Sequence, residues 1–254
     1  MRLKILNLVR SDERVDDLQC NGAKIIQNSN LYTFANDPIL LVNFAKIKSN
    51  ATVVDLCSGS GVIAILCAVK SDAKKIYAIE IQNVLAEMSE RSVKLNNLCD
   101  RVKVINDDIK NYSKYLNRAS VDVVFCNPPY FKKNSKKPCD NIVKTIARHE
   151  TQTNLEEVVK IASELLNSKG SFYLVHQAER LQEICAVCSK NKLAIKELML
   201  VQANKESLPH LVLIKAIKDG VQETKILQNL FLNKKDGTFT TIVNSMYNKK
   251  SIIK

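Results

Sequence analysis

Short runs of apolar, β-branched residues alternate with longer amphipathic segments from residue 51 onward. Runs of this length are typical of buried strands, and apolar residues spaced three or four apart are typical of helices. Strands are expected over 51–56, 75–79, 102–105, 121–126, 171–176, 193–201 and 211–216. Helices are expected over 62–70, 83–97 and 178–190, with a fourth running from a cap at Asn154 to a stop at Gly170. This order predicts an α/β fold: a seven-stranded, mostly parallel sheet with helices on both faces.

The segments on either side of this core predict smaller elements. Asn21-Gly22 is a turn signal before a strand candidate over 23–27, and Asn36 or Asp37 can cap a helix that has Pro38 at its first position. Beyond residue 221 the pattern is mixed and ends in a short helix near 240–247. We expect a single domain over 1–254, with a flank or lid over 1–48, a core over 49–217 and an extension over 218–254.

Polar residues and glycines follow the ends of the first three core strands. The first strand contains Asp55 and leads into Cys57-Ser58-Gly59-Ser60-Gly61, where glycines let a ligand approach the backbone. Glu80 ends the second strand, where an acid can bind the hydroxyls of a ribose. Asp107 and Asp108 follow the third, where an acid can accept a hydrogen bond from the amino group of adenine. Each acid alone is equally consistent with a helix cap, but three in succession predict a nucleoside site.

The fourth strand, 121–126, ends at Asn127-Pro128-Pro129-Tyr130. Two prolines cannot continue a strand, so an amide, a carbonyl in a fixed turn and an aromatic ring are left at the carboxyl end of the sheet. This combination suits a planar group that carries an amino group. An ordinary Pro-Pro turn with a packed tyrosine is the alternative that these four residues alone leave open.

The chain carries 38 basic and 26 acidic residues, a formal charge of +12. Such an excess favours a polyanionic partner that is bound through phosphate contacts, although a lysine-rich genome would give the same composition. Four lysines are concentrated directly after the Asn-Pro-Pro-Tyr tetrad, and we call this segment the lysine loop: Lys132, Lys133, Lys136 and Lys137. Its position favours phosphate contact over a merely solvated loop.

The eight cysteines and three histidines do not form a recognisable metal site. Cys185 and Cys188 have C-x-x-C spacing, but they lie in a helical pattern and no second pair completes a zinc site. We expect reduced thiols and no metal. The sequence contains neither a signal peptide pattern nor an apolar run of membrane-spanning length, so a cytoplasmic location is expected.

The strand-end motifs together resemble those of the class I S-adenosylmethionine-dependent methyltransferases, whose fold is Rossmann-like. Asn127-Pro128-Pro129-Tyr130 is similar to the tetrad of enzymes that methylate amide or exocyclic amino nitrogens. Further elements resemble the tRNA (adenine-37 N6)-methyltransferases that act on a valine tRNA, and the likeness covers nearly the whole chain. They are Phe34-x-x-Asp37-x-Ile39-Leu40-Leu41, Asp55-Leu56-x-x-Gly59-Ser60-Gly61, Ala147-Arg148 and Leu208-Pro209-His210.

The resemblance implies S-adenosylmethionine as cofactor, tRNA as partner and N6-methylation of an adenine in the anticodon loop. The catalytic residues would be Asn127, Pro128, Pro129 and Tyr130. The residues implied for cofactor binding are Asp37, Asp55, Cys57, Ser58, Gly59, Gly61, Glu80, Ile81, Asp107, Asp108, Ile109 and Asn127. RNA would be bound by the lysine loop, Arg148 and His149. Cys57 departs from the Gly or Ala common in the family at that turn.

Several other functions share this tetrad. Release-factor glutamine methyltransferases carry an N-terminal helical domain for which 48 residues are too few, and DNA adenine methyltransferases need a recognition insert for which this chain has no room. Methylation of guanine N2 in ribosomal RNA is the nearest alternative. A non-catalytic nucleotide- or RNA-binding module is the alternative from a different class, although pure binding gives no reason for two prolines beside an amide.

Overall fold

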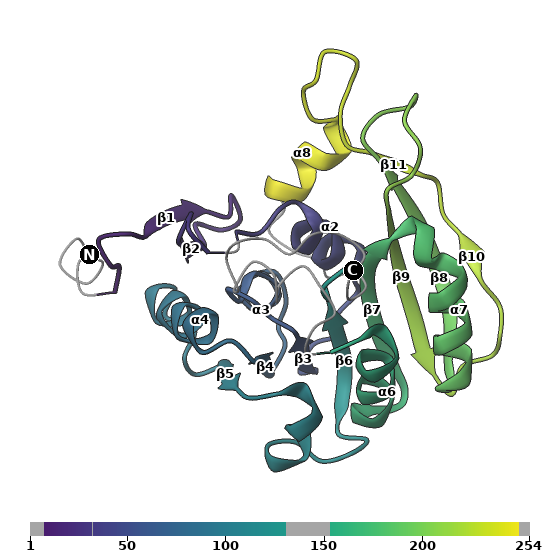
Figure 1. Ribbon diagram of the computed structural model, residues 1–254, viewed down its shortest axis with the longest axis horizontal. Coiled ribbons are helices and arrows are strands. Elements are labelled where there is room, and N and C mark those ends of the chain that lie inside the picture. Colours follow the sequence, from purple (N-terminus) through teal and green to yellow (C-terminus); the bar gives the residue numbers. More distant parts are fainter. Residues whose placement is uncertain (1–7, 32, 131–152, 249–254) are drawn as a thin grey trace.

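The computed structural model describes residues 8–31, 33–130 and 153–248. Within them a nine-stranded sheet has the order β10-β8-β9-β7-β6-β3-β4-β5, and β11 also pairs with β8 (Figure 1). Its strands are β3 (Thr52–Leu56), β4 (Lys75–Glu80), β5 (Val102–Asn106), β6 (Val121–Cys126), β7 (Leu166–Gln177), β8 (Leu193–Gln202), β9 (Leu211–Lys218), β10 (Lys225–Ile226) and β11 (Leu230–Phe231). Within this sheet, among the described residues, only the β7–β9 and β8–β9 pairs are antiparallel. The α/β fold with a mostly parallel sheet is confirmed, and the short edge strands β10 and β11 extend the seven predicted strands.

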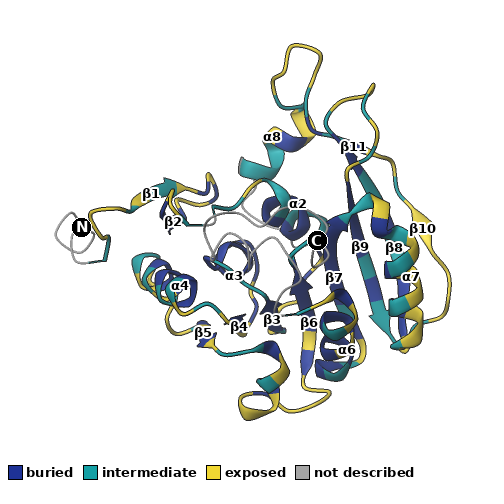
Figure 2. Cartoon of the chain, viewed as in Figure 1, coloured by how far each residue is buried: buried dark blue, intermediate teal, exposed yellow. Residues whose placement is uncertain are grey.

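Helices cover both faces of the sheet. They are α2 (Asp37–Phe44), α3 (Val62–Lys70), α4 (Asn83–Leu95), α6 (Leu155–Leu165), α7 (Leu181–Lys190) and α8 (Thr241–Asn248), with 3-10 helices η1 (Ile109–Lys114) and η2 (Ala178–Arg180). One apolar core lies between the sheet and α2 and α3, and a second lies between the sheet and α6 and α7. Adjacent strand residues alternate between these cores, as Val53 and Val54 do, so the central strands are buried on both sides (Figure 2).

The cap predicted at Asn154 is present, in a capping box with Glu157, but the predicted stop of that helix is wrong. The helix ends at Leu165 and β7 begins at Leu166. Gly170 lies inside β7, where β6 and β7 shift register. A Cβ on Gly170 would lie 2.9 Å from the carbonyl oxygen of Asn167, so this glycine accommodates the strand irregularity and does not end a helix.

The N-terminal segment forms a small antiparallel hairpin of β1 (Arg14–Asp17) and β2 (Lys24–Gln27). It packs on α4, where the Ile26 N–H donates to Ser92 Oγ at 3.0 Å and the Lys24 N–H donates to Asn96 Oδ1 at 2.8 Å.

None of the helices in the described parts of the chain is long and apolar enough to span a bilayer.

The helix α8 joins the C-terminal segment to the start of α2. The Tyr247 hydroxyl donates to Asn36 Oδ1 at 2.7 Å, so the Asn36 side chain is used here and does not cap α2 as predicted. The ammonium group of Lys70, a side chain that is only 2% exposed, donates to the Met246 carbonyl at 2.6 Å and to Asn43 Oδ1 at 2.8 Å. Three segments far apart in the sequence therefore meet at α2.

Candidate active site

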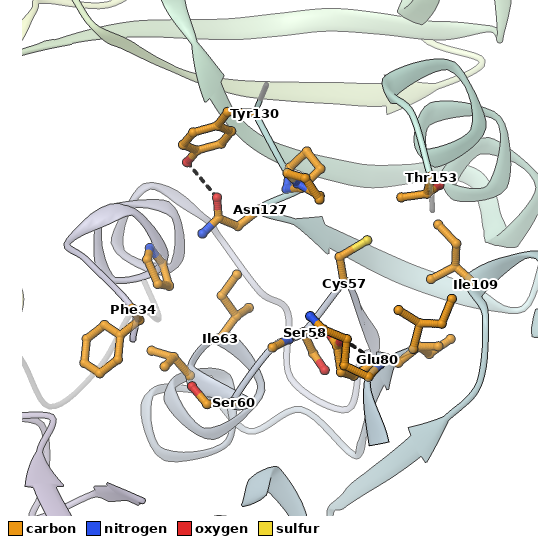
Figure 3. A pocket seen from close by; sticks show the side chains of 18 of the residues that line it. Phe34, Cys57, Ser58, Ser60, Ile63, Glu80, Ile109, Asn127, Tyr130 and Thr153 are labelled. Atoms are coloured by element: carbon orange, nitrogen blue, oxygen red, sulfur yellow. Dashed lines mark hydrogen bonds between the residues drawn. The ribbon is translucent and has the colours of Figure 1, made fainter. Parts of the chain in front are cut away.

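A cavity of about 420 Å³ lies at the carboxyl ends of β3, β4 and β6 (Figure 3). The chain leaves β3 towards β4 and β5 and returns to β6 on the other side of β3, so the strand order reverses here. Register places Leu56 of β3 beside Ile79 of β4 and Cys126 of β6, and the residues that follow these strands meet at one edge. Ligands of open α/β sheets bind at such a reversal.

The turn after β3 has three residues with positive φ: Cys57 at 58°, Gly59 at 55° and Gly61 at 85°. A Cβ on Gly59 would have no atom within 4 Å, so the backbone at Gly59 is open to a ligand. A Cβ on Gly61 would lie 2.2 Å from Ser89 Oγ, so this glycine allows the turn to pack against α4. Cys57 adopts a left-handed conformation at a cost that glycine would avoid.

Glu80 fixes this turn from the end of β4. Its Oε2 accepts a hydrogen bond from the Gly59 N–H at 2.8 Å and its Oε1 accepts one from the Gln82 N–H at 2.9 Å. Burial raises the pKa of Glu80 above its ordinary value, and the backbone N–H groups of Gln82, Gly59 and Ile81 offset part of that rise. Each carboxylate oxygen keeps a second lone pair for a hydroxyl of a ligand.

Asp55 lies fully buried within β3, behind the cavity wall, and neither of its carboxylate oxygens has a hydrogen bond of ordinary distance and angle in the described structure. Burial raises the pKa of Asp55 well above its ordinary value, the charge of Glu80 adds to the rise, and the Ala64 backbone N–H opposes it. A buried carboxyl group without a well-formed hydrogen bond is costly, which is typical of a functional site.

The two acids after β5 have different surroundings. Asp107 accepts hydrogen bonds from the Asn111, Lys114 and Tyr115 side chains, which lower its pKa, and it does not line the cavity. Asp108 lines the cavity, and its Oδ1 caps η1 by accepting from the Lys110 N–H at 2.9 Å. Of the two, Asp108 is the acid placed to meet a ligand.

The tetrad closes the other side of the cavity, and all four of its residues line it. The Tyr130 hydroxyl lies 2.6 Å from Asn127 Oδ1 and 2.6 Å from Asp37 Oδ2 (Figure 3 shows the first contact). Pro128 is buried, while Asn127 and Tyr130 are half-buried. The site therefore presents an amide, a fixed carbonyl and a ring, which together can orient an amino group.

The structure brings most of the expected residues to one cavity. Besides the tetrad, those that line it are Cys57, Ser58, Gly59, Glu80, Ile81, Asp108 and Ile109. Asp37, Asp55, Gly61 and Asp107 do not line the cavity, and the lysine loop, Arg148 and His149 lie outside the described residues. Sequence reasoning did not assign ten other lining residues to the site, of which only Phe34 and Ser60 belong to a motif: Thr33, Phe34, Ala35, Pro38, Ser60, Val62, Ile63, Ile79, Gln82 and Thr153. No group of three or more metal-ligating side chains occurs among the residues described.

Comparisons with known proteins agree with this arrangement. The family model for the methyltransferase small domain matches residues 36–185. A tRNA1(Val) (adenine(37)-N6)-methyltransferase of Bacteroides fragilis is 26% identical over 84% of this chain and 90% of its own, and one of Shewanella woodyi is 22% identical over 81% and 86%.

Solved structures show the same fold. A predicted O-methyltransferase of Agrobacterium tumefaciens superposes with a TM-score of 0.69 at 21% identity, over 85% of this chain and 97% of its own. TYW2 of M. jannaschii, solved with AdoMet, superposes with a TM-score of 0.56 at 15% identity, over 82% of this chain and 86% of its own.

The residues present fit the cofactor of this family. The open backbone at Gly59 leaves room for a ligand, and the acids at Glu80 and Asp108 are suited to the ribose and the base of an adenosine moiety. The buried Asp55, which has no well-formed hydrogen bond, lies behind them. S-adenosylmethionine supplies a methyl group on a sulfonium centre. The chain belongs to the methyltransferase small domain family of class I S-adenosylmethionine-dependent methyltransferases.

Proposed function

We propose that this protein methylates N6 of an adenine in the anticodon loop of a tRNA, adenine 37 of a valine tRNA. The observation that carries the proposal is the placement of Asn127 and Pro128 on the same cavity as Gly59, Glu80 and Asp108. Relatives that align over most of the chain and are named for this reaction support the choice of substrate.

The cofactor would lie along the edge of the sheet. Glu80 would accept hydrogen bonds from the ribose hydroxyls through the free lone pairs of its buried carboxylate. Asp108 would accept one from the adenine amino group, while Ile81 and Ile109 pack against the base. The turn at Ser58 and Gly59 would pass close to the amino-acid portion, whose ammonium group would compensate the buried Asp55 carboxylate.

The tetrad would bind the amino group that is methylated. The lone pair of an adenine amino group is delocalised into the ring, so the group is a poor nucleophile. The Asn127 side-chain oxygen and the Pro128 carbonyl would each accept one N–H, which frees the lone pair and aims it at the methyl group. No base is needed before attack, because the proton becomes acidic once the nitrogen is alkylated. Catalysis is then positioning and electrostatic fit.

The RNA would be held by charge and by stacking. The formal charge of +12 favours a polyanion, and we propose phosphate contacts by the lysine loop, Arg148 and His149. A base in an anticodon loop is unstacked at small cost, so it can enter a pocket. The Tyr130 ring would stack on it, an interaction worth about 1–3 kcal/mol.

Methyl transfer from labelled S-adenosylmethionine to unmodified total tRNA, followed by nucleoside digestion, tests the proposal. We expect N6-methyladenosine in one tRNA species. Asn127→Ala should lower the rate by at least about 100-fold, as for the loss of a preorganised polar group, with cofactor affinity within a few-fold. Label in guanine of ribosomal RNA or in a release factor would overturn the substrate, and cofactor binding without any transfer would favour a binding module.

A further inference from the structure

The tetrad tyrosine is held from three directions by residues distant in the sequence. Its hydroxyl lies 2.6 Å from Asp37, which is the first residue of α2 and 93 positions away. Its carbonyl accepts a hydrogen bond from the Arg180 guanidinium at 3.1 Å, and Arg180 is only 9% exposed and paired with Glu183. Its ring lies against the fully buried His176, with centroids 5.2 Å apart. The hydroxyl of Tyr130 therefore has a defined position between Asp37 and Asn127.

The protons available to Asp37, Tyr130 and Asn127 decide which way their hydrogen bonds can run. A phenol has one proton, a carboxylate has none, and an amide can either accept through its oxygen or donate through its nitrogen. In the structure Asn127 Oδ1 lies on the phenol side and the amide nitrogen points away from it (Figure 3). With Asp37 ionised, one proton then serves two oxygen–oxygen contacts of 2.6 Å, and one contact remains without a proton.

Half a turn of the Asn127 amide removes this shortage. Its nitrogen then donates to the phenol oxygen, and the phenol donates to the Asp37 carboxylate, so each contact contains a proton. The amide oxygen now takes the place of the nitrogen on the cavity side. That oxygen is the atom that accepts an N–H from an amino substrate, whereas the nitrogen in its place would repel the substrate.

We propose that Asp37 is a positioning residue, which acts through the Tyr130 hydroxyl to turn the oxygen of the Asn127 amide towards the substrate. The role of that oxygen rests on the function proposed above. Asp37 is not among the residues that line the cavity, so it would act through Tyr130 and not by contact with the substrate. Arg180, His176 and the α2 contacts hold the hydroxyl in place, so that the charge of Asp37 decides the direction of the hydrogen bonds.

Two substitutions of Asp37 should lower kcat by different amounts. In Asp37→Ala the carboxylate that accepts the phenol proton is gone, and we expect the proton to go to Asn127 Oδ1, which leaves the amide nitrogen facing the substrate. We expect kcat to fall about tenfold, with KM for the cofactor within about twofold. In Asp37→Asn the new amide can accept or donate, so both orientations of Asn127 are populated and kcat falls by only about twofold.

Removal of the phenol hydroxyl should abolish the dependence on residue 37. In a Tyr130→Phe background, Asp37→Ala should change kcat by less than about twofold. The matched control is Tyr112→Phe, which deletes another phenol–carboxylate contact of 2.6 Å, to Glu164, away from the tetrad. It should lower stability and leave the effect of Asp37→Ala unchanged. The proposal would be overturned if Asp37→Ala lowered kcat equally with tyrosine and with phenylalanine at residue 130. It would also be overturned if Asp37→Asn were as slow as Asp37→Ala.

A readout that needs no substrate separates this inference from the proposed function. The side-chain amide signals of Asn127 in a nitrogen-15 spectrum can be assigned by their loss in Asn127→Asp. We expect them to move in Asp37→Ala and in Tyr130→Phe but to stay in Tyr112→Phe. Unchanged signals in Asp37→Ala would refute the role of Asp37. If tRNA is not methylated while these shifts occur, only the proposed substrate is wrong.

Discussion

Replacing Gly61 with alanine should destabilise the protein by about 2–5 kcal/mol. Gly61 has φ of 85°, and an L-residue in the left-handed region costs about 1–2 kcal/mol. The new Cβ would also lie 2.2 Å from Ser89 Oγ and 3.2 Å from Ser89 Cβ. The serine hydroxyl can rotate away but its Cβ cannot, and overpacking of this kind costs about 1–3 kcal/mol.

A second substitution separates the two costs. Ser89→Gly removes both of the nearest atoms and leaves only Ser89 Cα, at 3.8 Å, which is ordinary contact. In that background Gly61→Ala should cost only the backbone part, about 1–2 kcal/mol. The four proteins of this cycle can be compared by urea unfolding followed by circular dichroism, with the free energy of unfolding extrapolated to water.

The coupling between the two positions should therefore be about 1–3 kcal/mol. If Gly61→Ala costs the same with Ser89 and with glycine at residue 89, the close packing of this turn on α4 is not what the glycine provides. Cofactor affinity should fall together with stability in the single variant, because displacement of the turn moves the Gly59 N–H that Glu80 holds at 2.8 Å.

Three further outcomes follow from the site. Glu80→Gln should weaken S-adenosylmethionine binding at least about tenfold, since its NH2 would face the N–H of Gly59 or Gln82; unchanged affinity in calorimetry would contradict this. The pKa of Asp55 is raised on folding, so its contribution to stability is full at low pH and is lost as the pH rises; the stability of wild type relative to Asp55→Asn should fall as the pH rises above about 4, the ordinary pKa of an aspartate, whereas a constant difference would be contrary evidence. Replacing the four lysines of the lysine loop with alanine should make tRNA binding less dependent on salt. The slope of log K against log salt concentration should fall by about 1 for each lost phosphate contact, and an unchanged slope would show that the loop is merely solvated.

The strands and the position of the site follow from local features of the sequence. Each of the first four core strands is a short apolar run that is closely followed by a glycine, a proline or an acid, and parallel strands bring such ends to one edge. Pro128 and Pro129 end β6 where predicted, because neither can donate to a ladder. Local signals of this kind are enough to predict where the cavity lies and that the tetrad lies beside it.

Contacts between distant residues could not be predicted in the same way. Gly59 and Gly61 share a motif, yet one faces open space and the other faces Ser89, and only the position of α4 distinguishes them. Asp107 and Asp108 are adjacent, and the residues of η1 decide which one remains at the cavity. The Asp37–Tyr130 contact joins residues 93 positions apart, so no periodic pattern carries it.

The contacts of α8 have a consequence for local unfolding. Its bonds to Lys70 and Asn36 span 176 and 211 residues, while the central sheet is held by many more contacts. A short helix held in this way can open without global unfolding, and hydrogen exchange would detect such an opening. Because Asn36 precedes Asp37, release of α8 would free the start of α2 and the carboxylate beside Tyr130. The exchange rate of the α8 amides should then report how often the tetrad loses its support.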